Sequence, residues 1–231
     1  NHEYYSEDAV LTAGQGTAYA AAAMEYGVII APKHLAFNDT EINRTGVSVF
    51  MTEQQARENE LRGTQAAIED AGALGVMTAF NRVGITAANA HTGLLKNILR
   101  GEWGFKGLES QDFIMNPNYA VLKEYALNGG TMTTFTGENT MAAVSEKFAY
   151  WTTENVGQDT ELMSAIKQAM TWQAYALANS NALDGMASST RLVSVRTWYD
   201  NALVAVQVVF AALTVLAAAM YVLNDRKSKK Q

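Results

Sequence analysis

The sequence contains no cysteine and only two prolines among its 231 residues. Without cysteine, disulfide bonds, thiolate metal sites and thiol nucleophiles are all excluded. Charged residues make up 17% and apolar residues 48%, which excludes a disordered protein because disordered chains bury too little apolar surface. The net charge of −6 argues against nucleic acid as the main partner, since phosphate binding usually needs a basic face. The length suits one substantial domain or two small ones.

One long apolar segment lies near the C-terminus. Residues 202–223 contain no charged side chain, and a helix over them would be roughly 33 Å long, enough to cross a hydrocarbon core of about 30 Å. We therefore predict a single transmembrane helix at 202–223, with a buried helix of a soluble domain as the alternative. Interfacial aromatic and basic residues flank the segment: Trp198, Tyr199, Tyr221, Arg226, Lys227, Lys229 and Lys230. Because lysine and arginine stay on the cytoplasmic side, we expect a cell-membrane protein with a basic cytoplasmic tail at 224–231 and the remainder outside.

The rest of the chain alternates short apolar runs with longer helical patterns, which is typical of β-α units and a parallel sheet. We predict an α/β fold with four strands and several helices. The strand candidates are 28–31, 75–79, 107–111 and 131–135, and the helix candidates are 12–25, 52–71, 90–100, 115–127 and 161–180. The third and fourth strand candidates are more polar than a strand buried on both faces usually is, so their prediction rests on their position in the alternation.

Polar residues follow the ends of three strand candidates. In parallel α/β folds the carboxyl ends of the strands line the ligand crevice. This placement selects Lys33, His34, Asn81, Arg82 and Asp112 as candidate site residues. Each also has an ordinary structural explanation, such as a solvated loop lysine, a hydrogen-bonded histidine or an aspartate that caps a helix.

Four sequence blocks point to a known family. They are NHEYYSED at 1–8, KHLAFND at 33–39 followed by Arg44, GVMTAFN at 75–81 and LRGEWGFKG at 99–107. In order and spacing they resemble glycoside hydrolase family 3, and more narrowly its β-glucosidase and β-xylosidase-like members. The resemblance covers about 1–135 and implies the later part of a TIM-like (β/α)8 barrel, with the earlier strands before Asn1.

The resemblance also implies roles for individual residues. Lys33 and His34 match the family's sugar-binding pair, Arg44 matches a further sugar-binding residue, and Phe80 stands in the same site where many members have tyrosine. Asp112 matches the catalytic nucleophile, a carboxylate that attacks the anomeric carbon in a retaining mechanism. The chain departs from the family pattern at Glu109, Gln111, Phe80 and Met132.

A retaining glycosidase also needs a second carboxyl as acid/base. In two-domain relatives this residue comes from another domain, and we expect that domain upstream of Asn1 in a larger parent protein. The family's N-acetylglucosaminidases use a loop histidine instead, but residues 35–39 here carry none.

The sequence therefore predicts an exo-acting β-glycosidase that hydrolyses O-glycosyl bonds of an oligosaccharide or β-glycoside substrate as part of a larger membrane-anchored enzyme. The alternative is a catalytically degenerate barrel that binds carbohydrate. We expect little turnover from these 231 residues alone, because loss of general acid catalysis costs about 10²–10⁴-fold. We expect no cofactor and no metal, since His2, His34 and His91 lack the spacing of zinc ligands. The predicted organisation is a barrel domain at 1–150, a helical extension and juxtamembrane linker at 151–201, the transmembrane helix and the tail.

Overall fold

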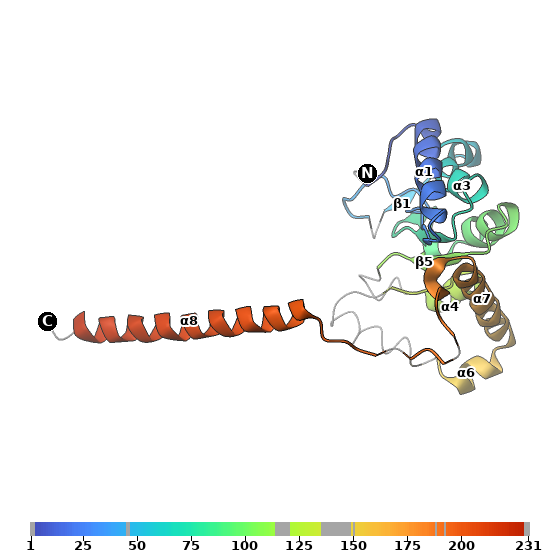
Figure 1. The fold of residues 1–231 in the computed structure, drawn as a ribbon. Helices are drawn as coiled ribbons and strands as arrows, with labels where there is room; N and C mark the ends of the chain where they lie inside the picture. The colour runs from blue at the N-terminus through green and yellow to red at the C-terminus, as the bar shows by residue number, and fades with distance from the viewer. Residues whose placement is uncertain are drawn as a thin grey trace. The chain divides into compact units, whose positions relative to one another are not determined.

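The computed structural model describes residues 3–44, 47–113, 121–134, 149, 151–187, 189–191 and 193–228. The chain divides into two compact units, Asn1–Asp184 and Gly185–Gln231. The first unit holds the sheets and most of the helices, and the second holds one long helix (Figure 1).

A parallel sheet forms the centre of the first unit. Strand β2 (Gly75–Thr78) pairs with β5 (Leu108–Gln111), with Gly75 opposite Leu108 and Thr78 opposite Gln111. Gly107, just before β5, passes so close to the Leu74 carbonyl that a Cβ atom would collide with it. Glycine is therefore required where the two strands come together.

Two further segments extend the β2–β5 pair on its two sides. The carbonyls of Ile30 and Pro32 accept hydrogen bonds from the N–H groups of β2, and Leu35 forms a parallel bridge with Thr78. On the other side, Ser110 of β5 forms a parallel bridge with Met132. The predicted strand at 131–135 is thus reduced to the bridge at Met132, and the one at 28–31 does not form: it offers only the Ile30 carbonyl, and the parallel bridge lies further on, at Leu35. Only the second and third form strands of four residues.

Helices cover the sheet. Helix α1 (Ala9–Met24) begins where the Asp8 side chain accepts the Leu11 N–H, and it packs beside α3 (Arg62–Glu69) (Figure 1). The predicted helix at 52–71 is divided into α2 (Glu53–Gln55), a π-wound segment η1 (Ala56–Glu60) and α3. The predicted helix at 90–100 appears as the π-wound segment η3 (Gly93–Glu102), preceded by a short 3-10 turn, η2 (Ala88–Ala90).

The C-terminal helices of the first unit follow the sheet. Among the described residues they are α4 (Leu122–Leu127), α6 (Thr153–Gln158) and α7 (Thr160–Ala178), followed by the 3-10 turn η5 (Asn181–Leu183). Helix α7 packs against α4, and Gln173 of α7 donates to the Thr131 carbonyl. The predicted helices at 115–127 and 161–180 correspond to α4 and α7, although 114–120 lie outside the described residues.

The hydrophobic core lies between the central sheet and its helices. Fully buried leucines from several elements meet there, including Leu35, Leu61, Leu95 and Leu99, together with Val76 of β2. A small second sheet joins β1 (Ser48–Val49), β3 (Arg82–Val83) and β4 (Thr86–Ala87) beside this core. The α/β architecture expected from the alternating pattern is therefore present in the described residues.

The second unit contains α8 (Trp198–Ser228). Its stretch Trp198–Leu223 is long and apolar enough to cross a membrane, and none of its most apolar window is buried inside the structure.

Candidate active site

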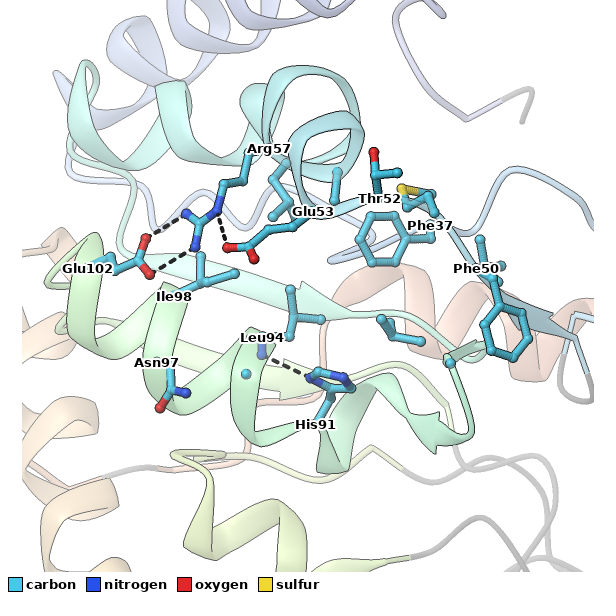
Figure 2. A pocket seen from close by; sticks show the side chains of 17 residues that line it. Phe37, Phe50, Thr52, Glu53, Arg57, His91, Leu94, Asn97, Ile98 and Glu102 are labelled. Atoms are coloured by element: carbon cyan, nitrogen blue, oxygen red, sulfur yellow. Dashed lines mark hydrogen bonds and ion pairs between the residues drawn. The ribbon is translucent and has the colours of Figure 1, made fainter.

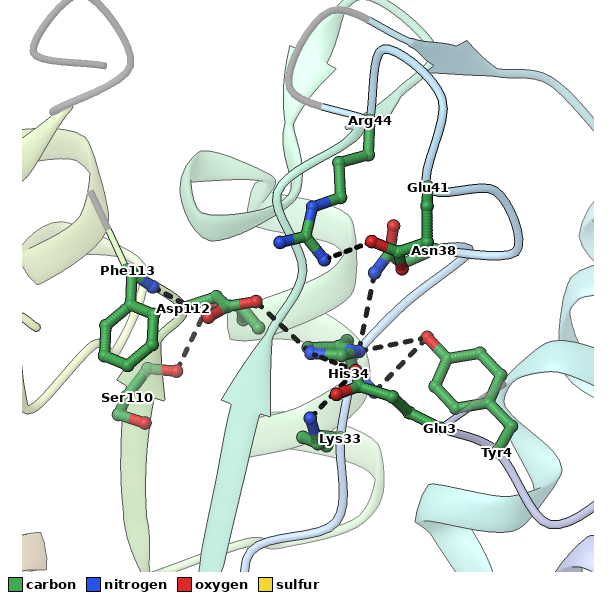
Figure 3. Close-up of polar contacts among 11 residues, drawn as sticks. Glu3, Tyr4, Lys33, His34, Asn38, Glu41, Arg44, Ser110, Asp112 and Phe113 are labelled. Carbon is green, nitrogen blue, oxygen red and sulfur yellow. Dashed lines mark hydrogen bonds and ion pairs between the residues drawn. The ribbon is translucent and has the colours of Figure 1, made fainter. Parts of the chain in front are cut away.

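Asp112 and His34 meet at the carboxyl edge of the parallel sheet. Asp112 directly follows β5, and its N–H donates to the Thr78 carbonyl at the end of β2. His34 ends the neighbouring extended segment. His34 Nε2 lies 3.2 Å from Asp112 Oδ2, and the two side chains are only 2% and 9% exposed (Figure 3). The packing thus brings together two candidates that lie 78 positions apart in the chain, because parallel strands end at the same edge.

The surroundings of Asp112 favour its carboxylate form. Burial alone would raise the pKa of this carboxyl, but the hydrogen bonds from His34 and the Phe113 N–H and the charges of His34 and Arg44 act in the opposite direction and are larger in sum. The net result is an Asp112 pKa below its usual value. An ionised, nearly buried carboxylate is the form that a nucleophile requires.

His34 is held in place from its other side. Its Nδ1 lies 3.3 Å from the Tyr4 hydroxyl and 3.5 Å from Asn38 Nδ2. Burial raises the Tyr4 pKa far above its usual value, although the hydrogen bond from the His34 main chain works against this. Tyr4 therefore keeps its proton, and its hydroxyl pairs with Nδ1 while the Nε2 side of the ring faces Asp112.

Lys33 and Glu3 form an ion pair next to this histidine. Lys33 Nζ lies 3.0 Å from Glu3 Oε2, and the same oxygen lies 3.8 Å from His34 Nε2 (Figure 3). Sequence analysis did not identify Glu3 or Tyr4 as site residues. They lie 30 positions from their partners, a separation at which no helical or strand periodicity signals a contact.

Arg44 and Phe80 lie against each other at the rim of the site. The guanidinium carbon of Arg44 is 4.5 Å from the centre of the Phe80 ring, and Arg44 Nη1 pairs with Glu41 at 2.7 Å. Arg44 is also one of the charges that lower the Asp112 pKa. Phe80 therefore contacts Arg44, and this cation–π interaction orients the guanidinium.

Asn81 supports a loop, and Arg82 lies on a strand of the small sheet. Asn81 is buried, and its Nδ2 donates to the Ala36 carbonyl at 3.0 Å, which supports the loop after His34. Arg82 belongs to β3. The alternative role of Asp112 as a cap for a helix at 115–127 concerns residues outside the described ranges.

The polar residues of β5 point away from Asp112. Glu109 and Gln111 are fully buried, and Gln111 Oε1 accepts a hydrogen bond from Asn89 at 2.6 Å. Neither carboxyl oxygen of Glu109 has a hydrogen-bond partner in the described structure. Burial raises the Glu109 pKa to about 7, although Tyr125 and the charge of Arg100 favour ionisation. Alternation along the strand explains why these residues face the helices rather than the site.

A cavity of about 360 Å³ adjoins the site on the Tyr4 side. Lys33, His34, Glu3 and Tyr4 line it together with residues of α1 and α3, whereas Asp112 does not. Among the described residues, which exclude His2, no cluster of His, Asp and Glu side chains has metal-site geometry.

Comparison with known proteins gives the family. The model of the glycosyl hydrolase family 3 N-terminal domain matches residues 1–131. Probable beta-glucosidase J of Emericella nidulans is 40% identical over 111 residues, which are 48% of this chain and 13% of that protein.

Two solved structures share the fold. A beta-glucosidase from Paenibacillus barengoltzii, 24% identical, has a TM-score of 0.68 over 83% of this chain and 21% of its own. A beta-glucosidase from Kluyveromyces marxianus in complex with glucose, 26% identical, has a TM-score of 0.57 over 77% of this chain and 21% of its own. The chain thus spans only a small part of these relatives, and through residues 1–131 it belongs to glycosyl hydrolase family 3.

Proposed function

We propose that this chain is part of a retaining β-glycosidase that removes terminal, non-reducing β-linked sugars, as a β-glucosidase does. The observation that carries the proposal is the nearly buried Asp112 carboxylate, 3.2 Å from His34 and with a lowered pKa. The family membership and the beta-glucosidase relatives support the same reaction class. We also propose that the parallel β-α units form the later part of a (β/α)8 barrel.

In the proposed reaction an oxygen of Asp112 attacks the anomeric carbon, and the bond from that carbon to the leaving oxygen breaks. The result is a covalent glycosyl-enzyme, which water then hydrolyses. Lys33, His34 and Arg44 are N–H donors at the edge of the site, suited to hold sugar hydroxyls. The leaving oxygen takes its proton from a second carboxyl, which we assign to another domain of the parent protein.

We propose further that the protein is anchored in a cell membrane by α8. The length and apolar character of Trp198–Leu223 support a span, and the basic residues after it favour a cytoplasmic tail. Under this proposal the site faces outward, toward glycosides outside the cell.

Mechanism-based labelling tests the proposal. The full-length protein is incubated with a 2-deoxy-2-fluoroglucoside that carries an activated leaving group, and its peptides are mapped by mass spectrometry. This reagent needs the nucleophile but depends little on the acid/base. We expect a sugar adduct on the peptide that contains Asp112, absent in Asp112→Asn and retained in Asp184→Asn, which changes an exposed aspartate in the same way.

The alternative function is carbohydrate binding without catalysis. It is favoured by Phe80, which offers no hydroxyl to Asp112 and lies against Arg44 instead. In that case the folded protein binds glucose but forms no adduct. Such a result would reject the hydrolase proposal and leave the binding function.

A further inference from the structure

A second cavity lies outside the site described above. Its volume is about 510 Å³, within the range of roughly 300–1,000 Å³ that is usual for small-molecule sites. It opens between η1 and η3, beside the small sheet of β1 and β3 (Figure 2). Lys33, His34 and Asp112 do not line it.

The walls of this second cavity are mostly apolar. Phe37, Leu61 and Leu94 are buried residues of its lining, and Phe50 stands beside it with 73% of its surface exposed. Ala56 of η1 contributes only a methyl group. Aromatic and aliphatic walls favour a flat apolar ligand, because burial of a ring gains hydrophobic free energy and ring contacts.

The charged side chains at the cavity are already paired. Arg57 donates to both carboxyl oxygens of Glu102 at 2.6 and 2.9 Å, and its Nε donates to Glu53 at 2.8 Å (Figure 2). Three of the five guanidinium N–H groups are thereby bonded to carboxylates. One guanidinium and two carboxylates leave this group with a net charge of −1, which disfavours an anionic ligand.

His91 supplies a directional polar group. Its Nδ1 accepts the Leu94 N–H at 3.0 Å, so the neutral ring carries its proton on Nε2. Burial lowers the His91 pKa, which keeps the ring neutral near pH 7. Among the described residues, Nε2 has no recorded hydrogen-bond partner. His91 lines the cavity and can therefore donate one hydrogen bond to an occupant.

The backbone around the cavity is unusual. The two π-wound segments, η1 and η3, both line it. Wide turns of this type are rare and often occur at functional sites. Phe37 lines this cavity as well as the one next to Lys33 and His34, and it lies in a left-handed conformation with φ of 68°. An occupant would thus contact the loop that carries the candidate sugar-binding residues.

We infer that this cavity binds a neutral aromatic molecule with one hydrogen-bond acceptor, of the phenol or aryl-ether class. Its ring packs among the apolar walls near Phe37, and its oxygen accepts the Nε2–H of His91. This site is separate from the proposed hydrolysis and does not depend on it.

Ligand-observed ¹⁹F NMR tests the inference. The full chain in lipid nanodiscs is titrated with 4-fluorophenol and, separately, with fluorobenzene, and empty nanodiscs give the lipid background. We expect saturable binding of 4-fluorophenol, about tenfold tighter than that of fluorobenzene, which lacks the acceptor. Absence of saturable binding above the background overturns the inference.

Substitutions at the cavity and at an exposed control position locate the site. Ala56→Leu fills the cavity and should weaken 4-fluorophenol binding at least tenfold, whereas Ala22→Leu adds the same atoms to an exposed position of α1 and should not. His91→Asn keeps an acceptor for the Leu94 N–H but lacks the ring donor, so the preference for 4-fluorophenol should disappear. If Ala56→Leu does not fold, Val83→Phe fills the cavity from β3 instead. Equal binding by the wild type and a folded filled variant overturns the inference.

Discussion

At the scale of single residues, two buried carboxyls of the same strand region have opposite properties. Asp112 lies beside His34 and near Arg44, and its pKa is lowered. Glu109 lies three positions earlier on the other face, without a hydrogen-bond partner for its carboxyl, and its pKa is raised to about 7. The two pKa values differ because hydrogen-bond donors and positive charges outweigh the effect of burial at Asp112 but not at Glu109.

The contact between His34 and Asp112 leads to a prediction about pH. Asp112 must be ionised to attack, so labelling is lost as the pH falls through its lowered pKa. Replacing His34 by Asn removes the imidazole that contributes to this lowering, and the midpoint of the acid limb should rise. The measurement is the rate of labelling by the activated fluoroglucoside between pH 3 and 8. His91→Asn, outside the site, should leave the midpoint unchanged, and an unchanged midpoint in His34→Asn would contradict the assigned role.

Glu109 gives a prediction about stability. Its pKa is about 7 in the folded chain and 4.5 as a free group, so the folded state binds more protons between these values. The contribution to stability is therefore complete below about pH 4.5 and is lost as the pH rises through 7. Glu109→Gln mimics the neutral form and should raise the free energy of unfolding at pH 8 by on the order of 3 kcal/mol, with little change at pH 4.5.

Urea unfolding at the two pH values measures the effect of Glu109. Glu25→Gln, at the exposed end of α1, is the matched control and should change the free energy of unfolding by less than about 0.5 kcal/mol at either pH. An equal effect of Glu109→Gln at both pH values would mean that the pKa of Glu109 is not raised in the folded chain.

At the scale of elements, one side chain joins η3 to the loops around β5. Arg100 donates to the carbonyls of Phe105, Gly107 and Gly129, at distances from 2.7 to 3.2 Å. Its guanidinium carbon lies 3.8 Å from the centre of the Trp172 ring of α7. Burial lowers the Arg100 pKa to about 10, so the group stays charged at neutral pH. Arg100 therefore helps to place the strand that leads to Asp112.

Arg100→Lys tests this connection. A lysine cannot reproduce the planar fork, so buried carbonyls would lose their donors, and the free energy of unfolding should fall by about 2–3 kcal/mol. Arg62→Lys, at a partly exposed ion pair with Asp70 of 3.6 Å, is the control and should cost less than about 0.5 kcal/mol. Chemical denaturation measures both, and similar losses in the two variants would contradict the proposed role of Arg100.

Local sequence patterns predicted the strand β5 but not the way in which one predicted helix is divided. The strand at 107–111 was predicted from its position although its composition is polar, and β5 forms at Leu108–Gln111. Its polar side chains are accommodated by tertiary contacts, such as that between Gln111 and Asn89. The division of the helix predicted at 52–71 into α2, η1 and α3 was not predictable, because the wide turns of η1 leave the apolar spacing nearly unchanged.

At the scale of the whole molecule, the chain combines a family 3 unit with a long apolar helix. Its length is small compared with the relatives: it spans 13% of probable beta-glucosidase J of Emericella nidulans. The membrane span stays a prediction from length and composition.

Membrane insertion of α8 can be tested directly. Two arginines near the middle of an apolar span cost several kcal/mol of insertion free energy. The double substitution Leu213→Arg and Leu216→Arg should therefore move the chain from the membrane fraction to the alkaline-soluble fraction. The control, Leu213→Ile and Leu216→Ile, should remain in the membrane. If the arginine variant also resists alkaline extraction, α8 does not anchor the chain by spanning the bilayer.

The amino-acid sequence by itself determined the β-α alternation, the long apolar helix, and the motif residues Lys33, His34 and Asp112. Hydrophobic periodicity and short motifs are local properties, so they can be read without coordinates. Only the tertiary structure decided that Glu3 pairs with Lys33, that Glu109 is buried without a partner, and that a cavity opens beside Ala56. These features depend on which segments, distant in the sequence, pack against one another. The free energy of packing is a sum over many such contacts, and a local sequence pattern does not contain them.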